Sequence, residues 1–213
     1  MEPEAGLRDG VRAALPIALG PLLFGVSFGL LARGAGIGSV TAIAFSATTF
    51  AGAAQFAAVS VLGAGGSVAA AVLLNARYAP MSVAAAGAFR GGLLRRLVDA
   101  QLLVDESWAL ARRDGRFRRE ILLGAGVLLY VLWIGGTVVG TVVGNSLGSP
   151  SDYGLDAAFA ALFLGLARPT LVGRRAVTAA VVAAAVVVVL LPFTPPGVPI
   201  VAASAACLFG LVR

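Results

Sequence analysis

Long apolar runs, separated by short connections that carry most of the arginines, constrain this chain more than any other feature of its sequence. A helix needs about 20 predominantly apolar residues to cross the hydrocarbon core of a bilayer. Seven segments are candidates: Ala13–Ala32, Val40–Leu62, Ser67–Phe89, Ile121–Leu147, Leu155–Val172, Val177–Leu191 and Val198–Val212. The sequence therefore predicts an all-α fold, a polytopic transmembrane helix bundle of about seven spans, with residues 1–213 forming a single membrane domain.

The composition favours a membrane protein over a soluble or nucleic-acid-binding one. Apolar residues make up 59% of the chain and charged residues only 12%, whereas soluble domains have about 45–50% and about 25%. A soluble domain of this length still exposes a large polar surface, so it cannot bury that excess. The net charge of +6 does not indicate nucleic acid, because the arginines cluster between apolar runs, as they do in cytoplasmic membrane loops.

The arginine distribution predicts an orientation. The segment Arg90–Glu120 is rich in arginine, and such loops stay in the cytoplasm. With seven spans, the carboxyl terminus lies on the same side as this segment, and the amino terminus lies outside. One re-entrant segment would invert part of this arrangement.

The last three predicted spans are short, and Leu155–Val172 is interrupted by Arg168 and Pro169. Short or broken apolar segments indicate the binding region of a transporter. Helix tilt, thinning of the bilayer or shielding by a neighbouring helix are the alternatives. The glycines are also ordered, since they recur at positions 136, 140, 144 and 148 and again at Gly25 and Gly29. Small residues four apart let helices approach closely, so we interpret these glycines as packing positions.

Arg77 is a cation inside a predicted span, and no carboxylate lies three or four positions away to neutralise it. Ionisable residues within spans are functional candidates by default. The group that neutralises Arg77 must come from another helix, from a substrate carboxylate or from water at the interface. The alternative to a functional role is a purely structural ion pair buried between helices. Pro80 cannot donate to the Ala76 carbonyl, so we expect a kink that turns Asn75, Arg77 and this carbonyl into one cavity.

Gln55 is a carboxamide within the second predicted span, where Thr48, Gly52 and Gln55 would share one helix face. Such a group needs hydrogen bonds, because lipid offers none. It is expected to face a hydrated cavity or to bond another helix.

No basic residue lies three or four positions from Asp105, Glu106 or Asp156. The first two belong to Leu93–Arg113, which is predicted as one amphipathic helix with Asp105 on its apolar stripe, whereas Asp99 is expected to pair with Arg95 and Arg96. Carboxylates in apolar surroundings are candidates for a raised pKa and for proton handling. The alternatives are an ion pair with an arginine of the same loop and, for Asp156, a helix N-cap.

Several classes of protein are disfavoured. The chain has no His and a single Cys, Cys207, so we expect neither a metal site nor an intramolecular disulfide. The run GNSLG resembles a nucleophile elbow, but it ends an apolar helix and has no His partner. Without Walker or GxGxxG loops in the sequence, we expect no cofactor and no enzymatic activity.

Four runs in order, FAGAAQFAAV (Phe50–Val59), LLNARYAPM (Leu73–Met81), LLVDESWAL (Leu102–Leu110) and GLDAAFAALFLGL (Gly154–Leu166), resemble the AzlC family of branched-chain amino acid exporters. The family's Phe-(Ala/Gly)-Gly-x-x-Gln-Phe pattern falls on Phe50, Gly52, Gln55 and Phe56, and its Asn-x-Arg-(His/Tyr) pattern on Asn75, Arg77 and Tyr78. Val104 stands where relatives often have Thr, so a hydroxyl is lost before Asp105 and Glu106.

The resemblance implies a multi-pass permease of the cytoplasmic membrane that exports valine, leucine and isoleucine with a small AzlD-type membrane subunit. Arg77 would hold the substrate carboxylate, Asn75 and Gln55 would meet the ammonium group, and Phe50 and Phe56 would receive the side chain. Asp105, Glu106 or Asp156 would carry a proton in exchange. A passive small-solute channel component and a scaffold subunit without transport activity are the alternatives.

Overall fold

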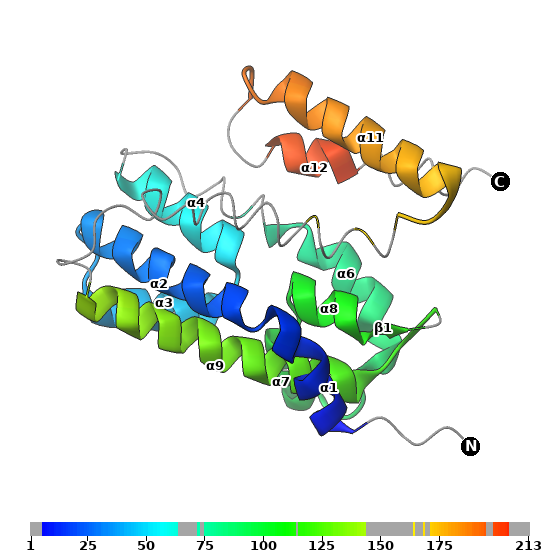
Figure 1. Cartoon of the computed structure of the whole chain (residues 1–213), viewed down its shortest axis with the longest axis horizontal. Helices are drawn as coiled ribbons and strands as arrows, with labels where there is room; N and C mark the ends of the chain where they lie inside the picture. Colours follow the sequence, from blue (N-terminus) through cyan, green and yellow to red (C-terminus); the bar gives the residue numbers. More distant parts are fainter. Residues whose placement is uncertain are drawn as a thin grey trace.

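The computed structural model describes residues 6–63, 72, 75–113, 115–143, 164, 168, 171–194 and 198–204. These residues are helical apart from loops and a short antiparallel hairpin of β1 (Arg112–Arg113) and β2 (Arg116–Phe117). The helices are α1 (Leu7–Ala14), η1 (Leu15–Ile17), α2 (Leu19–Gly34), α3 (Ser39–Thr49), α4 (Gly52–Gly63), α6 (Tyr78–Ala85), η2 (Ala86–Ala88), α7 (Leu93–Gln101), α8 (Asp105–Ala111), α9 (Arg119–Val143), α11 (Gly173–Leu190) and α12 (Val198–Ser204). The predicted all-α membrane bundle is confirmed (Figure 1).

Within the described residues, α9 and α11 are each long and apolar enough to cross a bilayer. The stretch from α1 to α2 forms a third span if its 66° bend is counted within one span, and α3 is a shorter apolar helix. The segments expected near 67–89, 155–172 and 198–212 lie wholly or partly outside the described residues. The count of seven spans therefore stays a prediction.

The helices α2 and α9 pack along each other through their glycines. A side chain at Gly136 would strike the Leu22 carbonyl oxygen, and one at Gly29 would come within 2.6 Å of the Thr137 carbonyl oxygen. Gly25 and Gly140 make equally close approaches to the backbone of the facing helix. The predicted packing role of these glycines is confirmed, whereas Gly144 and Gly148 lie outside the described residues.

The first helices run in the same direction as α9. The Leu7 carbonyl lies against Gly124 near the start of α9, and Val26 lies against Gly140 near its end. The amino terminus of the described chain is thus at the same end of the bundle as the start of α9, next to the arginine-rich segment (Figure 1). The expected placement of the amino terminus opposite that segment was wrong.

The cause is a break in the predicted span Val40–Leu62. Phe50 adopts a left-handed backbone conformation with φ of 39° and separates α3 from α4. The ring of Phe28 in α2 lies 6.0 Å from the ring of Phe45 in α3 and 5.9 Å from the ring of Phe56 in α4. The helices α3 and α4 therefore lie beside the same part of α2. In one continuous helix, Ser46 and Gln55 would be about 13 Å apart along the axis, yet their side chains are hydrogen-bonded at 3.0 Å.

The helices α3 and α4 therefore form a re-entrant pair that enters and leaves on the same side of the bundle. Figure 1 shows α4 returning beside α2, toward the end where α2 and α9 finish. Thr48 and Gln55 consequently lie on different helices, and the single polar face expected for Thr48, Gly52 and Gln55 was wrong. A re-entrant pair adds no crossing, which is why α1 and α9 can start on the same side.

Two further local expectations were wrong. The Ala76 carbonyl accepts the Ala79 N–H at 3.1 Å, so it is not left free, because Pro80 sits in the first turn of α6, where a missing N–H costs nothing. The segment Leu93–Arg113 is not one helix, since α7 ends at Gln101 and α8 starts at Asp105.

The break between α7 and α8 also changes the partner of Asp99. Asp99 as a residue is only 3% exposed, and its carboxylate accepts two hydrogen bonds of 2.7 Å from Arg119 of α9. The expected solvent-exposed pairing of Asp99 with Arg95 and Arg96 was therefore wrong. The ion pair ties the inner face of α7 to the start of α9.

Candidate functional site

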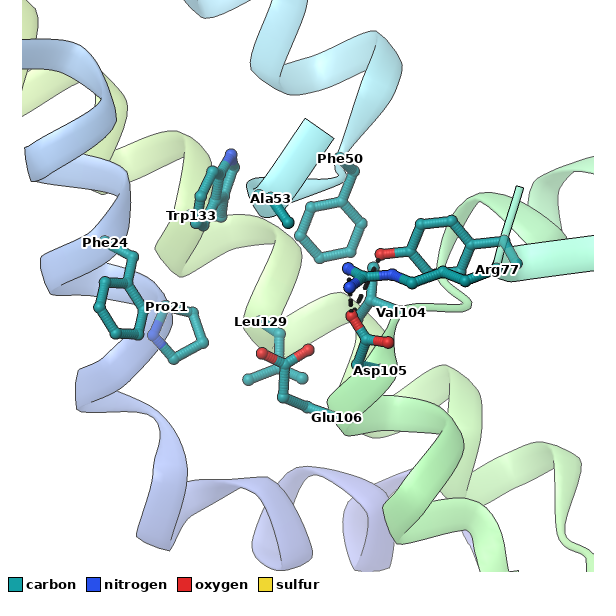
Figure 2. Close-up of a pocket in the computed structure, with 12 residues that line it drawn as sticks. Pro21, Phe24, Phe50, Ala53, Arg77, Val104, Asp105, Glu106, Leu129 and Trp133 are labelled. Carbon is teal, nitrogen blue, oxygen red and sulfur yellow. Dashed lines mark hydrogen bonds and ion pairs between the residues drawn. The ribbon is translucent and has the colours of Figure 1, made fainter. Parts of the chain in front are cut away.

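A pocket lies where α8, the start of α4 and the residues before α6 meet α2 and the middle of α9. Its walls combine apolar side chains with three charged ones (Figure 2). The lining residues are Pro21, Phe24, Phe50, Gly52, Ala53, Arg77, Tyr78, Val104, Asp105, Glu106, Leu129 and Trp133. The charged groups of the pocket thus lie on its α8 and α6 side.

Arg77 is neutralised by a carboxylate from another helix. Its Nη2 lies 2.7 Å from Oδ2 of Asp105, and the Tyr78 hydroxyl donates to the same oxygen at 3.4 Å. The guanidinium also lies over the Tyr78 ring, 5.3 Å from its centroid. The side chains of Arg77 and Asp105 remain 23% and 19% exposed, so this pair faces the pocket and is not sealed in the core.

Glu106 is the second carboxylate of the pocket and lies apart from this pair. In Figure 2 its carboxylate points toward Leu129 and Pro21, away from Arg77. Among the described residues, no cation lies within salt-bridge distance of it. Burial and, to a smaller extent, the charge of Asp105 raise the pKa of Glu106 to about 7. Burial also raises the pKa of Asp105, although Arg77 opposes that change.

Gln55 lies outside the pocket lining and is fully buried. Its Nε2 donates to Ser46 Oγ at 3.0 Å, its Oε1 accepts the Ala51 N–H at 3.2 Å, and Ser46 Oγ is 2.9 Å from Thr137 Oγ1. This network joins α3, α4 and α9. It corresponds to the interhelical alternative for Gln55 and holds the re-entrant pair against α9.

The remaining predicted site residues have different places. Phe50 lines the pocket and packs edge-on against Tyr130 at 5.0 Å, whereas Phe56 packs against Phe28 and Trp133 behind the pocket wall. Asn75 is partly buried and outside the lining, and its Oδ1 has no hydrogen-bond donor among the described residues. Asp156 lies outside the described residues.

The pocket is small in this structure. Its cavity volume is about 30 Å³, which is room for about two water molecules. Small-molecule pockets usually measure about 300–1,000 Å³. An amino acid could therefore enter only after the surrounding helices separate.

The sequence alone did not indicate the apolar walls Pro21, Phe24, Leu129 and Trp133. These residues look like ordinary positions of apolar spans, and nothing in their spacing relates them to Arg77. Their place in the pocket follows from the packing of α2 on α9, which the glycine patterns of the two helices could have suggested.

A polytopic apolar bundle with an ion pair and a separate carboxylate around an internal pocket defines a transporter-like integral membrane protein. Residues 16–147 match the model of the AzlC protein family, and the chain belongs to this family. The expected family membership is thus confirmed.

The chain is similar to membrane proteins from distant organisms. It is 31% identical to an uncharacterised membrane protein of Archaeoglobus fulgidus over 84% of this chain and 82% of that protein. It is 29% identical to an uncharacterised membrane protein of Helicobacter pylori, over 75% and 73%. It is 27% identical to the inner membrane protein YgaZ of Escherichia coli, over 99% and 91%. No solved structure matches the chain.

Proposed function

We propose that this protein is a secondary transporter of the cytoplasmic membrane that exports valine, leucine and isoleucine in exchange for protons. The observation that carries the proposal is the convergence of Arg77, Asp105 and Glu106 on one pocket with apolar walls. The resemblance to branched-chain amino acid exporters supports the choice of substrate, and the inner-membrane name of the similar YgaZ supports the choice of membrane.

The substrate is a zwitterion, and the pocket offers groups of both signs. The substrate carboxylate replaces Asp105 as the partner of Arg77, because a guanidinium binds a carboxylate through two parallel hydrogen bonds. The ammonium group is then held by the released Asp105 and by Glu106. Phe24, Leu129 and the neighbouring apolar walls receive the branched side chain.

Proton exchange follows from the charge balance of the same pocket. Arg77 and Asp105 cancel each other, so the ionisation of Glu106 decides the net charge. A protonated Glu106 cannot hold an ammonium group as an ion pair, whereas an ionised one can. Proton and amino acid therefore occupy the site in alternation, which is the requirement for exchange.

The transporter works with a small membrane subunit of the AzlD type, an expectation that rests on the family resemblance. The proton gradient supplies the energy. The small cavity of about 30 Å³ supports a carrier that opens alternately over a continuously open channel. A scaffold subunit without transport activity would not need the charged side chains that line the pocket.

The experiment is valine transport in proteoliposomes, with and without the small subunit, under an imposed pH gradient. The native protein is expected to show counterflow of labelled valine and gradient-driven export. Arg77→Lys keeps the charge but not the two-pronged geometry and should raise KM strongly, while Glu106→Gln should abolish the response to the pH gradient. Glu120→Gln changes an exposed carboxylate outside the pocket and serves as the control.

Two results would overturn the proposal. Flux without saturation or counterflow would identify a passive channel component. Normal transport by both pocket variants, each correctly folded, would show that this pocket is not the transport site. The absence of any transport by the native protein with its small subunit would favour the scaffold alternative.

A further inference from the structure

The helix α7 presents an apolar face to its surroundings. Leu93, Leu94, Leu97 and Val98 are 75%, 77%, 58% and 59% exposed. At 100° per residue, these four positions fall within an arc of about 140°. The described part of the protein covers none of this face, although the helix belongs to a connecting segment and not to a span.

Asp99, on the side opposite the leucines, and Gln101, at the carboxyl end, fix α7 to the bundle. Asp99 points inward, where it pairs with Arg119. Gln101, at the end of the helix, donates to the carbonyls of Ala47 and Thr48 at 3.2 Å and 3.0 Å. The orientation of α7 is therefore set by the protein, so its exposed leucines cannot simply turn inward.

Positive charge surrounds the exposed leucines. Arg90, Arg95 and Arg96 are exposed around them, and Asp99, the one acidic residue of α7, is buried and already neutralised. Arg8 and Arg12 of α1 lie at the same end of the bundle and are also exposed. An apolar face edged by arginine at the end of a membrane bundle matches an in-plane helix at a lipid surface.

We propose that α7 lies in the plane of the membrane surface and binds anionic phospholipid. The leucine face enters the boundary between headgroups and acyl chains, and Arg90, Arg95 and Arg96 bind lipid phosphates. Arginine suits this task because its planar guanidinium binds phosphate with two hydrogen bonds. The anionic lipid is favoured over a protein partner because the rim of this face carries one sign of charge, complementary to the cytoplasmic leaflet.

The contacts of Gln101 connect this lipid surface to the pocket. Ala47 and Thr48 are in the last turn of α3, three and two residues before Phe50, which lines the pocket. Lipid bound at α7 thus holds the tip of the re-entrant pair in place. The lipid site itself does not depend on which solute the protein transports.

The test uses single cysteines, since Cys207 is the only cysteine of the chain and can be changed to Ser. Leu94→Cys places a fluorescent probe on the apolar face, and Arg96→Cys places it on the charged side of the same helix. The full chain is reconstituted into vesicles of phosphatidylcholine with phosphatidylglycerol, or of phosphatidylcholine alone. Quenching by nitroxide-labelled lipid is compared with quenching by aqueous iodide.

The probe at Leu94 is expected to be quenched by nitroxide lipid several-fold more than the probe at Arg96. This difference should shrink without phosphatidylglycerol, and also in an Arg90→Gln, Arg95→Gln background. If Leu94→Cys fails to fold, Leu97→Cys carries the probe on the same face. Strong iodide quenching at Leu94, protection from both quenchers by a protein partner, or indifference to the anionic lipid would each overturn the proposal.

Discussion

At the scale of single residues, the two ion pairs of the connecting segment differ in what surrounds them. Asp99 is buried and Arg119 is partly buried between α7 and α9, with side-chain exposures of 5% and 15%. Arg77 and Asp105 are more exposed and face the pocket. Removing one partner of a buried pair leaves an uncompensated charge, so substitutions in the first pair should cost more stability than substitutions in the second.

Asp99→Asn should destabilise the protein strongly, because it leaves the partly buried Arg119 without its counter-charge. The expected loss is about 3–5 kcal/mol, measured as the free energy of unfolding in detergent. Glu120→Gln, at the next residue of α9 and exposed, should cost less than about 1 kcal/mol. Equal effects of the two substitutions would contradict the assignment of Asp99 as a buried structural partner.

Glu106 should make stability depend on pH. Its pKa is raised from 4.5 to about 7 in the folded protein, so the fold favours the protonated carboxyl. The contribution is full below pH 4.5 and is lost as pH rises through about 7, with an upper limit of about 3 kcal/mol. Melting temperature against pH should fall across this window in the native protein and stay flatter in Glu106→Gln; parallel curves would refute the shift.

At the scale of helices, the re-entrant pair α3 and α4 shows how a helix can end inside an apolar bundle. Its last carbonyls need partners, since lipid provides none. The Tyr130 hydroxyl donates to the Ala47 carbonyl at 2.7 Å, and Gln101 donates to the carbonyls of Ala47 and Thr48. Side chains of α7 and α9 thus replace the hydrogen bonds that a continuous helix would have made.

The contact between α2 and α9 gives a prediction with an internal control. A Cβ at Gly136 would strike the Leu22 carbonyl, whereas a Cβ at the adjacent Gly135 meets nothing within 4 Å. Gly136→Ala should therefore force the helices apart and lower the unfolding free energy by about 1–3 kcal/mol. Gly135→Ala should be neutral or stabilising by up to about 1 kcal/mol, and a reversed order in thermal melts would disprove this packing.

At the scale of the whole molecule, the parallel course of α2 and α9 sets the orientation. Arg8 and Arg12 join the arginines of the Arg90–Glu120 segment at one end of the bundle, and Arg33 lies at the other end of α2. From this distribution, the positive-inside rule predicts that the amino terminus lies in the cytoplasm.

Cysteine labelling in a Cys207→Ser background tests this orientation. Arg8→Cys and Arg116→Cys should react with a membrane-impermeant maleimide only after the cells are permeabilised. Ala35→Cys, exposed in the connection between α2 and α3, should react in intact cells. Labelling of Arg8→Cys from outside while Arg116→Cys stays protected would contradict the parallel arrangement.

Particular residues show how far sequence reasoning reached. The span expected at Ile121–Leu147 is present as α9 over Arg119–Val143, because a long apolar run is itself the cause of a spanning helix. The need of Arg77 for a partner from elsewhere was also predicted. Asp105 could not be identified as that partner, because it is 28 residues away and no helical periodicity relates the two.

The break between α3 and α4 at Phe50 also could not be predicted from the sequence. Neither Gly nor Pro occupies position 50, and a left-handed backbone is uncommon for a bulky residue. Among the described residues, the aromatic packing on Tyr130 and the buried bonds of Gln55 support this conformation.

Membrane embedding, helical class and close glycine packing were determined by the sequence itself, since they depend on the local density and spacing of apolar and small residues. The direction of the amino terminus, the re-entrant pair and the partner of each charge were decided only by the tertiary structure. These features depend on which distant segments meet, and a buried charge or carbonyl accepts whichever suitable group the packing brings within reach.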